Sequence, residues 1–304
     1  MISIKQLTYA RAVGRTLHFK NAAEECNVSP SALSTALNEL ESQLGMKIFE
    51  RDTKKVLITP AGKTVLERIE NILVEVEDLQ SMASLNQSPL SAPMSIGFIP
   101  TIAPFLLPNL LKELHKNYPD FQLMVSEEQS HSLVEKVRSG ELDAGILALP
   151  YPCEGLLTFE FWEEDFYWIA RFDNAFAKLH EISSAELETS QLMLLKEGHC
   201  LKDHILDACK MSERQAEHGF SATSLTTLIQ MVAGGLGTTL VPEMALKQLL
   251  GQNHELASVH LNEPGPHRSI ALIMRPNYPR ISSIEALKAL AKEALGPLRH
   301  SRFD

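Results

Sequence analysis

Cysteine is scarce in this chain: there are four in 304 residues, and no two of them are separated by only two residues. That short spacing is typical of zinc sites, so its absence argues against a structural metal site built on cysteine. Long apolar runs are also absent, since no segment approaches the roughly 20 apolar residues of a membrane-spanning helix. The N-terminal segment lacks the continuous apolar stretch of a secretory signal. We therefore expect a cytoplasmic protein without a membrane partner, in which thiols are kept reduced and any disulfide bond is transient.

Basic residues are fewer than acidic ones: the chain has 28 Lys and Arg residues and 38 Asp and Glu residues, which gives a formal net charge of −10. This balance argues against a protein that coats nucleic acid without sequence preference. The charge is uneven, however: residues 1–63 carry nine basic and six acidic side chains, a net charge of +3, which leaves −13 for the remainder. A small module that meets phosphate, joined to a larger acidic part, would have this distribution.

The segment 19–45, FKNAAEECNVSPSALSTALNELESQLG, has the pattern of two helices joined by a tight turn. Ser29 is suited to the N-cap of the second helix and Pro30 to its first position. After them, leucines at positions 33, 37, 40 and 44 recur at helical spacing and predict one buried stripe. The outward face then carries three candidates for contact with the DNA groove: Ser31, Thr35 and Asn38. The pattern alone fits an ordinary helical hairpin equally well.

The next segment, KIFERDTKKVLITP, has two short strand-like runs around a polar turn, which favours a winged helix-turn-helix. The turn carries three side chains suited to phosphate contact: Arg51, Lys54 and Lys55. Thr59 and Pro60 then begin a long helix whose apolar residues at 65, 69, 72, 76 and 79 form a heptad pattern. Such a seam predicts pairing with a second helix, although packing of this helix on its own domain is an alternative. We expect a DNA-binding domain at 1–59 and a dimerisation helix with its linker at 60–87.

From residue 94 onward, strand-like and helix-like segments alternate, in the order MSIGFI, APFLLPNLLKELHKNYP, FQLMVSE, HSLVEKVRSGE and DAGILAL. This order predicts a parallel sheet with helices on its faces. A second unit of the same kind is expected from about 165 to 267, and RSIALIM is expected to return to the first unit as a strand. The predicted class is therefore α/β with two lobes, residues 92–163 with 269–304 in the first and 164–268 in the second. A cleft between two such lobes is a usual place for a small ligand.

The order of these parts resembles the LysR-type transcriptional regulators over nearly the whole chain. The stretch AAEECNVSPSALSTALNELESQLGMKIFERDTKKVLITPAG carries the resemblance in the first domain. The rest is most similar to the hydrogen-peroxide sensors of that family, through GFIPTIAPFLLP, EEQSHSL, LMLLKEGHCLKDHILDAC, GFSATSLTTLIQMVAGGLG and PHRSIALIMRP. The resemblance implies a winged helix, a linker helix and a two-lobed effector domain like periplasmic binding proteins. It also implies a regulator rather than an enzyme, which binds promoter DNA as a dimer of dimers and contacts RNA polymerase.

Cys200 and Cys209 lie nine positions apart in GHCLKDHILDACK, a segment whose apolar residues have helix-compatible spacing. On one helix, their Cα atoms would be separated by about 13.5 Å along the axis, at 1.5 Å per residue. A disulfide bond needs Cα atoms within about 7 Å. The two thiols can therefore join only if the helix melts or refolds, which would make the bond a conformational switch. If the segment is a loop, the bond still requires a rearrangement.

Cys200 is the expected peroxidatic residue, because it would lie in the first helical turn, where unpaired N–H groups favour a thiolate, with Lys196 and Lys202 near it in the sequence. Cys209 is the expected resolving residue, which attacks the sulfenic acid that hydrogen peroxide forms on Cys200. The resemblance points to five side chains in a peroxide pocket: Thr101, Ser130, His199, Asp203 and Arg268. Position 130 is commonly threonine in the peroxide sensors, and serine keeps the hydroxyl. No cofactor is expected.

Other interpretations stay open at this point. Cys200 and His204 would share a helix face and, with Asp203, could bind a metal ion, although a fourth ligand is not obvious. A regulator of the same family could instead bind a small organic effector in the cleft, with the cysteines incidental. A thiol peroxidase is disfavoured by the winged helix. Cys26 is expected in the core of the first domain, and Cys153 in a loop.

Overall fold

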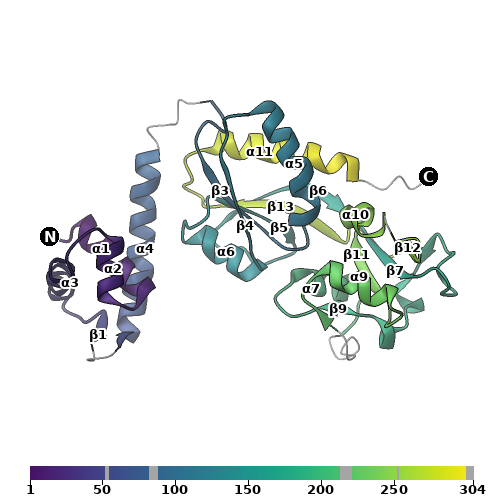
Figure 1. Ribbon diagram of the computed structural model, residues 1–304, viewed down its shortest axis with the longest axis horizontal. Helices are drawn as coiled ribbons and strands as arrows, with labels where there is room; N and C mark the ends of the chain where they lie inside the picture. The colour runs from purple at the N-terminus through teal and green to yellow at the C-terminus, as the bar shows by residue number, and fades with distance from the viewer. Residues whose placement is uncertain (52–54, 82–87, 213–220, 252, 299–304) are drawn as a thin grey trace. The chain divides into compact units, whose positions relative to one another are not determined.

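The computed structural model describes residues 1–51, 55–81, 88–212, 221–251 and 253–298, and the chain divides into two compact units, Met1–Asn86 and Gln87–Asp304 (Figure 1). Residues 82–87 of the expected linker, and the tail after residue 298, lie outside the described residues. No helix within these ranges is long and apolar enough to cross a membrane. Each unit has its own hydrophobic core.

The helix-turn-helix part of the first unit consists of three helices: α1 (Ile4–Thr16), α2 (Phe19–Glu25) and α3 (Pro30–Leu44). α3 begins as the sequence predicts, because the Ser29 hydroxyl accepts a hydrogen bond from a first-turn N–H at 3.2 Å and proline follows it. It ends at Gly45, whose φ of 68° closes the helix. Leu33, Leu37 and Leu40 are fully buried, which confirms the predicted apolar stripe.

The wing is an antiparallel pair of strands, β1 (Phe49–Arg51) and β2 (Val56–Ile58). Glu41 of α3 is buried beneath it. Its carboxylate accepts hydrogen bonds from three donors: Lys47 Nζ at 2.8 Å, Ile48 N at 2.9 Å and Phe49 N at 3.1 Å. Burial alone would raise the pKa of this carboxyl group, but the hydrogen bonds hold its pKa below the usual value. Glu41 therefore joins α3 to the wing, a link that sequence reasoning did not predict.

α4 (Pro60–Ser81) begins where the sequence predicts, with the Thr59 hydroxyl accepting a hydrogen bond from a first-turn N–H at 2.8 Å. The apolar residues of its heptad pattern have different surroundings. Ile69 is buried in the core of the first unit, whereas Ile72 and Leu79 are 47% and 66% exposed. The helix thus packs on its own unit, as one interpretation held, and also presents apolar side chains outward.

The first lobe of the second unit is a five-stranded sheet in the order β4-β3-β5-β13-β6. Its strands are β3 (Met94–Phe98), β4 (Leu123–Glu127), β5 (Ala144–Leu149), β6 (Leu157–Glu164) and β13 (Arg268–Met274). β3 is parallel to β4 and β5, as predicted, and β13 returns from the second lobe to pair with β5 and β6 in the antiparallel sense. Helices α5 (Ala103–Asn117) and α11 (Ile281–Leu295) pack together on one face, and α6 (Ser130–Arg138) covers the other (Figure 1).

The second lobe contains a four-stranded sheet in the order β11-β7-β12-β8 and a short parallel pair, β9 with β10. Its strands are β7 (Phe166–Arg171), β8 (Glu181–Ile182), β9 (Leu194–Leu195), β10 (Ser221–Ala222), β11 (Thr239–Pro242) and β12 (Leu256–Leu261). Its helices include α7 (Cys200–Ala208), α9 (Leu225–Ala233) and α10 (Leu246–Leu250). The prediction of a second parallel unit is wrong, because β7 is antiparallel to both of its neighbours. β11 and β12 run in the same direction, as a strand-helix-strand crossover requires, but β7 is inserted between them.

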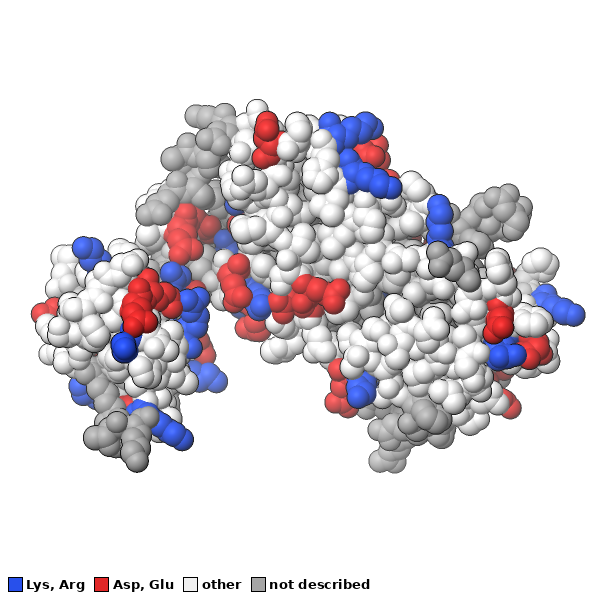
Figure 2. Space-filling view, in the orientation of Figure 1, with Lys and Arg blue, Asp and Glu red and all other residues white. Residues whose placement is uncertain are grey.

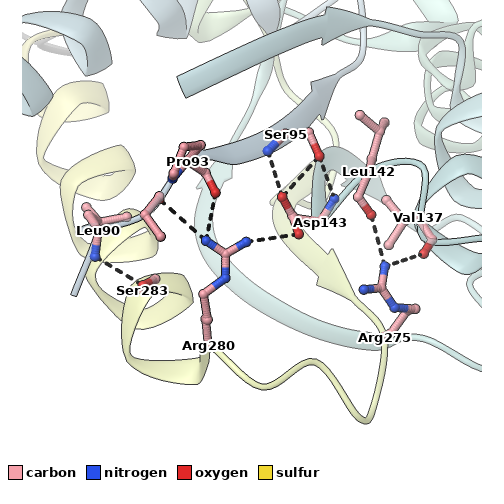
Figure 3. A network of polar contacts seen from close by, with 10 residues as sticks. Leu90, Pro93, Ser95, Val137, Leu142, Asp143, Arg275, Arg280 and Ser283 are labelled. Atoms are coloured by element: carbon pink, nitrogen blue, oxygen red, sulfur yellow. Dashed lines mark hydrogen bonds and ion pairs between the residues drawn. The ribbon is translucent and has the colours of Figure 1, made fainter. Parts of the chain in front are cut away.

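A network of polar contacts fixes the start of the second unit to its first lobe (Figure 3). Arg280, just before α11, donates hydrogen bonds to the Pro93 carbonyl at 2.7 Å and to the Asp143 carboxylate at 3.2 Å. The same carboxylate accepts hydrogen bonds from the backbone N–H and the hydroxyl of Ser95, at 2.7 and 3.0 Å. This network therefore lies at the N-terminal ends of β3 and β5. Their C-terminal ends lead toward the candidate site.

Candidate functional site

Cys200 and Cys209 lie at opposite ends of α7. The helix runs without a break from Cys200 to Ala208, and Cys209 is its C-cap residue, which confirms the prediction that one helix holds both thiols. Both cysteines are free, and they are 3% and 5% exposed. At 1.5 Å per residue, their Cα atoms are separated by about 13.5 Å along the axis. In this conformation they are beyond the reach of a disulfide bond.

Burial raises the pKa of the Cys200 thiol. Three neighbours oppose this effect: the Ser130 hydroxyl, the Arg268 guanidinium and the Ala148 N–H. The negative charge of Asp203 acts in the same direction as burial. The net shift is upward, so the expectation of a thiolate favoured at the helix end is wrong for this conformation, because removal from water outweighs the favourable neighbours.

The basic residues near Cys200 in the sequence are not the ones that act on it in space. Lys196 is exposed and Lys202 is partly exposed, and the cation that lowers the pKa of Cys200 is Arg268. Burial raises the pKa of Cys209 to about 12, and the charge of Glu263 acts in the same direction. Cys209 is therefore almost wholly protonated at neutral pH.

Arg268 is fully buried, and its partner Glu164 connects the first lobe to the second. Its guanidinium forms an ion pair with one carboxylate oxygen of Glu164, at 2.7 and 2.8 Å, and neither side chain is exposed. It also donates hydrogen bonds to the Thr101 hydroxyl at 3.2 Å and to the Thr101 carbonyl at 3.3 Å. The other oxygen of Glu164 accepts a hydrogen bond from Met244 N, in the second lobe, at 2.8 Å. A buried anion thus balances the cation beside Cys200. Sequence reasoning missed Glu164, whose only signal is a run of three acidic residues, 163–165, between two strand-like runs.

Two further polar residues are neighbours of Cys200: Ser130 in space and His199 in the sequence. Ser130 begins α6 and His199 is the N-cap residue of α7, and they are 2% and 7% exposed. The Ser130 hydroxyl faces the Cys200 thiol. Among the described residues, His199 Nδ1 has no hydrogen-bond partner. Burial lowers the pKa of His199, against the opposing charge of Glu127, so its ring is neutral near pH 7. Asp203, by contrast, is exposed.

His204, one turn after Cys200, is 2% exposed, and its Nε2 lies 2.9 Å from the Pro150 carbonyl. A carbonyl only accepts hydrogen bonds, so Nε2 carries the proton and Nδ1 is the unprotonated nitrogen. Burial lowers the pKa of His204 to about 4, so the ring is neutral at physiological pH. The ligands of the metal interpretation do not converge: within the ranges that the structure describes, no three His, Cys, Asp or Glu side chains form a group suited to a metal ion.

The candidate DNA-contact residues of α3 lie on its outer face. All three are exposed: Ser31, Thr35 and Asn38. Lys55 of the wing is exposed as well, whereas Lys54 and the side chain of Arg51 lie outside the described residues. On the face seen in Figure 2, basic and acidic side chains are interspersed over the first unit.

Both units match one family. Residues 4–63 match the family described as "Bacterial regulatory helix-turn-helix protein, lysR family", and residues 87–296 match the "LysR substrate binding domain". The chain therefore belongs to the LysR family of DNA-binding transcription regulators. The predicted architecture, a helix-turn-helix followed by the two-lobed α/β domain of that family, is confirmed.

Individual members of the family show which of its proteins this chain is similar to. EstR, a transcriptional regulator of Acinetobacter baylyi, is 38% identical over 298 residues, which cover 97% of this chain and 98% of EstR. A "probable hydrogen peroxide-inducible genes activator" of Streptomyces viridosporus is 37% identical over 300 residues, which cover 97% of this chain and 95% of that protein. Among solved structures, a variant of full-length OxyR from Pseudomonas aeruginosa matches with a TM-score of 0.80 and 33% identity, over 96% of this chain and 95% of that one. The predicted resemblance to the peroxide-sensing members of the family is thereby confirmed.

Proposed function

We propose that this protein is a peroxide-responsive transcription regulator, in which hydrogen peroxide oxidises Cys200 and a bond between Cys200 and Cys209 changes the contacts with promoter DNA. One observation carries the proposal: a single helix, α7, separates the two thiols, so linking them must dismantle that helix. A chemical change at one sulfur thereby becomes a change in the shape of the second lobe.

The reaction would consume one peroxide and two thiols. The Cys200 sulfur attacks one oxygen of the peroxide, the O–O bond breaks, and the departing oxygen leaves as water with the thiol proton. The Cys209 sulfur then attacks the sulfenic acid on Cys200, an S–S bond forms, and the second oxygen leaves as water. The protein is itself oxidised and needs an external reductant to return to the dithiol form. The helix-turn-helix unit supports a regulator rather than an enzyme. The reaction requires no cofactor.

The polar atoms around Cys200 fit hydrogen peroxide, a small molecule that both donates and accepts hydrogen bonds. The Ser130 hydroxyl faces the Cys200 thiol. His199 Nδ1 is buried without a hydrogen-bond partner among the described residues, and buried polar atoms usually have one. Thr101 and Arg268 would complete the pocket, and Asp203, being exposed, would act through its charge. Because burial raises the pKa of Cys200, orientation of the peroxide and stabilisation of its departing oxygen must supply the acceleration.

The first unit would bind promoter DNA through the outer face of α3 in the groove and the basic side chains of the wing on phosphates. The exposed Ile72 and Leu79 of α4 support pairing with the same helix of a second copy. Two such pairs would form the homotetramer. RNA polymerase would be the further partner at the promoter, in the cytoplasm.

The names of the relatives differ in whether they mention peroxide. The Streptomyces relative is named as peroxide-inducible, whereas the name of EstR, at a similar identity, does not mention peroxide. A small organic effector is therefore the competing function. It predicts a response that does not depend on either cysteine of α7.

Peptide mapping of the full-length protein after stoichiometric hydrogen peroxide tests the proposal. We expect one linked peptide pair, Cys200 with Cys209, and no promoter response to peroxide in the Cys200→Ser and Cys209→Ser variants. Cys153→Ser is the matched control, because Cys153 lies outside α7, and it should respond like the wild type. An unreacted Cys200, or a peroxide response that survives its replacement, would contradict the proposal and favour an organic effector.

A further inference from the structure

α7 is short and weakly capped, so its stability depends on contacts with the rest of the protein. It has nine residues, fewer than the roughly 12 to 15 that an isolated helix needs in water. Its N-cap residue, His199, makes no side-chain capping bond. At the other end, the closing turn places Lys210 at a φ of 52°, a left-handed conformation that glycine usually takes after a helix.

His204 adds a directed contact to the apolar packing of α7. Its Nε2–H donates to the carbonyl of Pro150 at 2.9 Å, and Pro150 directly follows strand β5 of the first lobe. Two residues earlier in the same segment, the N–H of Ala148 faces the Cys200 thiol. The end of β5 therefore touches α7 at two points one helical turn apart, the thiol and the imidazole.

The imidazole contact involves neither sulfur. It can persist when Cys200 becomes a sulfenic acid, and it is lost only when α7 opens. Because the His204 ring is 2% exposed, both the N–H and the carbonyl would be left without a partner if they separated without reaching water. Opening of the helix is the event that exposes them.

We propose that His204 is a positioning residue that latches α7 in the reduced conformation. This inference rests on the proposed function, because a latch matters only if Cys200 and Cys209 form a bond. His204 lies between the two cysteines, so dismantling the helix between them separates the imidazole from Pro150. The strength of this one hydrogen bond then contributes to the free-energy difference between the dithiol and disulfide forms.

The hydrogen bond from His204 to Pro150 is present only in the dithiol form, and this determines the direction in which its loss shifts the redox equilibrium. Removing the donor raises the free energy of the dithiol form alone, so the disulfide forms more readily and the midpoint potential becomes more negative. We expect about a tenfold change in the equilibrium, which for a two-electron couple is about 30 mV. The attack of Cys209 on oxidised Cys200 should become faster by up to about the same factor.

A redox titration of the full-length protein against glutathione buffers tests the latch, with the linked Cys200–Cys209 peptide measured by mass spectrometry. His204→Phe fills similar space without a donor, and His204→Gln keeps an N–H donor of similar reach. We expect the potential of His204→Phe to be about 30 mV more negative than that of the wild type, and that of His204→Gln to stay near the wild-type value. Lys210→Gly relieves the left-handed strain of the reduced helix and should move the potential in the opposite direction.

Far-UV circular dichroism checks that each variant folds. If His204→Phe does not fold, His204→Asn, whose amide is too short for the same contact, replaces it in the comparison with His204→Gln. Equal potentials for the donor and donor-free variants would overturn the latch and leave the disulfide switch intact, even if thermal stability falls. A wild-type protein that forms no Cys200–Cys209 bond in any buffer would overturn the proposed function, and the latch with it.

Discussion

At the scale of single residues, the effect of a charge on the pKa of Cys200 depends on whether that charge is paired with an opposite one. Arg268 lowers the pKa of the thiol, yet its guanidinium is bound to Glu164 and both groups are withdrawn from water. A cation held against an anion exerts a weaker field on the sulfur than a lone cation would. Burial raises the pKa of Cys200, and this pairing weakens the influence of Arg268 that would lower it.

Replacing Glu164 tests that restraint. Glu164→Gln should lower the pKa of Cys200, because the charge of Arg268 is then unbalanced while a hydrogen-bond acceptor remains. The pH dependence of the alkylation rate of Cys200 should shift to lower pH. Breaking the buried pair should also reduce the free energy of unfolding by about 3 to 5 kcal/mol. Glu163→Gln, at the exposed neighbouring position, should change neither quantity, and an unchanged or raised pKa of Cys200 in Glu164→Gln would argue against the restraint.

At the scale of elements, Glu41 is the link between α3 and the wing, and its loss should loosen the wing. Glu41→Gln should accelerate amide hydrogen exchange at Ile48 and Phe49, because their acceptor is weakened by about 1 to 3 kcal/mol. In the folded protein, the pKa of Glu41 lies below the usual glutamate value of 4.5, so the stabilisation is present above that pH and is lost as the pH falls through the folded pKa. The difference between wild type and variant should therefore be larger at pH 7 than at pH 4. A difference of equal size at both values would contradict this account, and the exposed Glu24→Gln is the control.

Elements that follow from local spacing could be predicted from the sequence, whereas partners that are far apart in the chain could not. The Ser29 cap, the leucine stripe of α3 and the helix between the two cysteines all follow from neighbouring residues. The contact of His204 with Pro150 spans 54 positions and that of Arg268 with Glu164 spans 104, and no sequence period marks either pair. The same holds for β7, whose place between β11 and β12 depends on sheet pairing.

The direction of the Cys200 pKa was misjudged for a related reason. The argument from the helix end is local, because it depends on the N–H groups of one turn. Burial of the sulfur is a tertiary effect, and the neighbours that oppose it, Ser130, Ala148 and Arg268, also come from segments distant in sequence. Tertiary burial therefore sets the direction of the pKa shift of Cys200, which an argument from neighbouring residues does not include.

At the scale of the second unit, three neighbouring strands connect the candidate site with the start of the unit. β3 leads to Thr101, the end of β5 faces α7, and β13 begins with Arg268. At the beginnings of β3 and β5, the network around Asp143 and Arg280 fixes the segment that leads into this unit (Figure 3). A change in the conformation of α7 therefore occurs beside one end of these strands. The other ends of β3 and β5 hold the segment that leads into the second unit.

Amide hydrogen exchange across α7 tests the central claim most directly. In the reduced protein, helix bonds such as that from Cys209 N to Ile205 O, at 3.0 Å, should protect this segment. After peroxide treatment, the protection should be lost in the wild type and kept in Cys209→Ser, in which Cys200 can be oxidised but no disulfide can form. Equal protection of α7 in the reduced and the disulfide-linked protein would contradict the account, because sulfurs at the two ends of an intact helix cannot be joined.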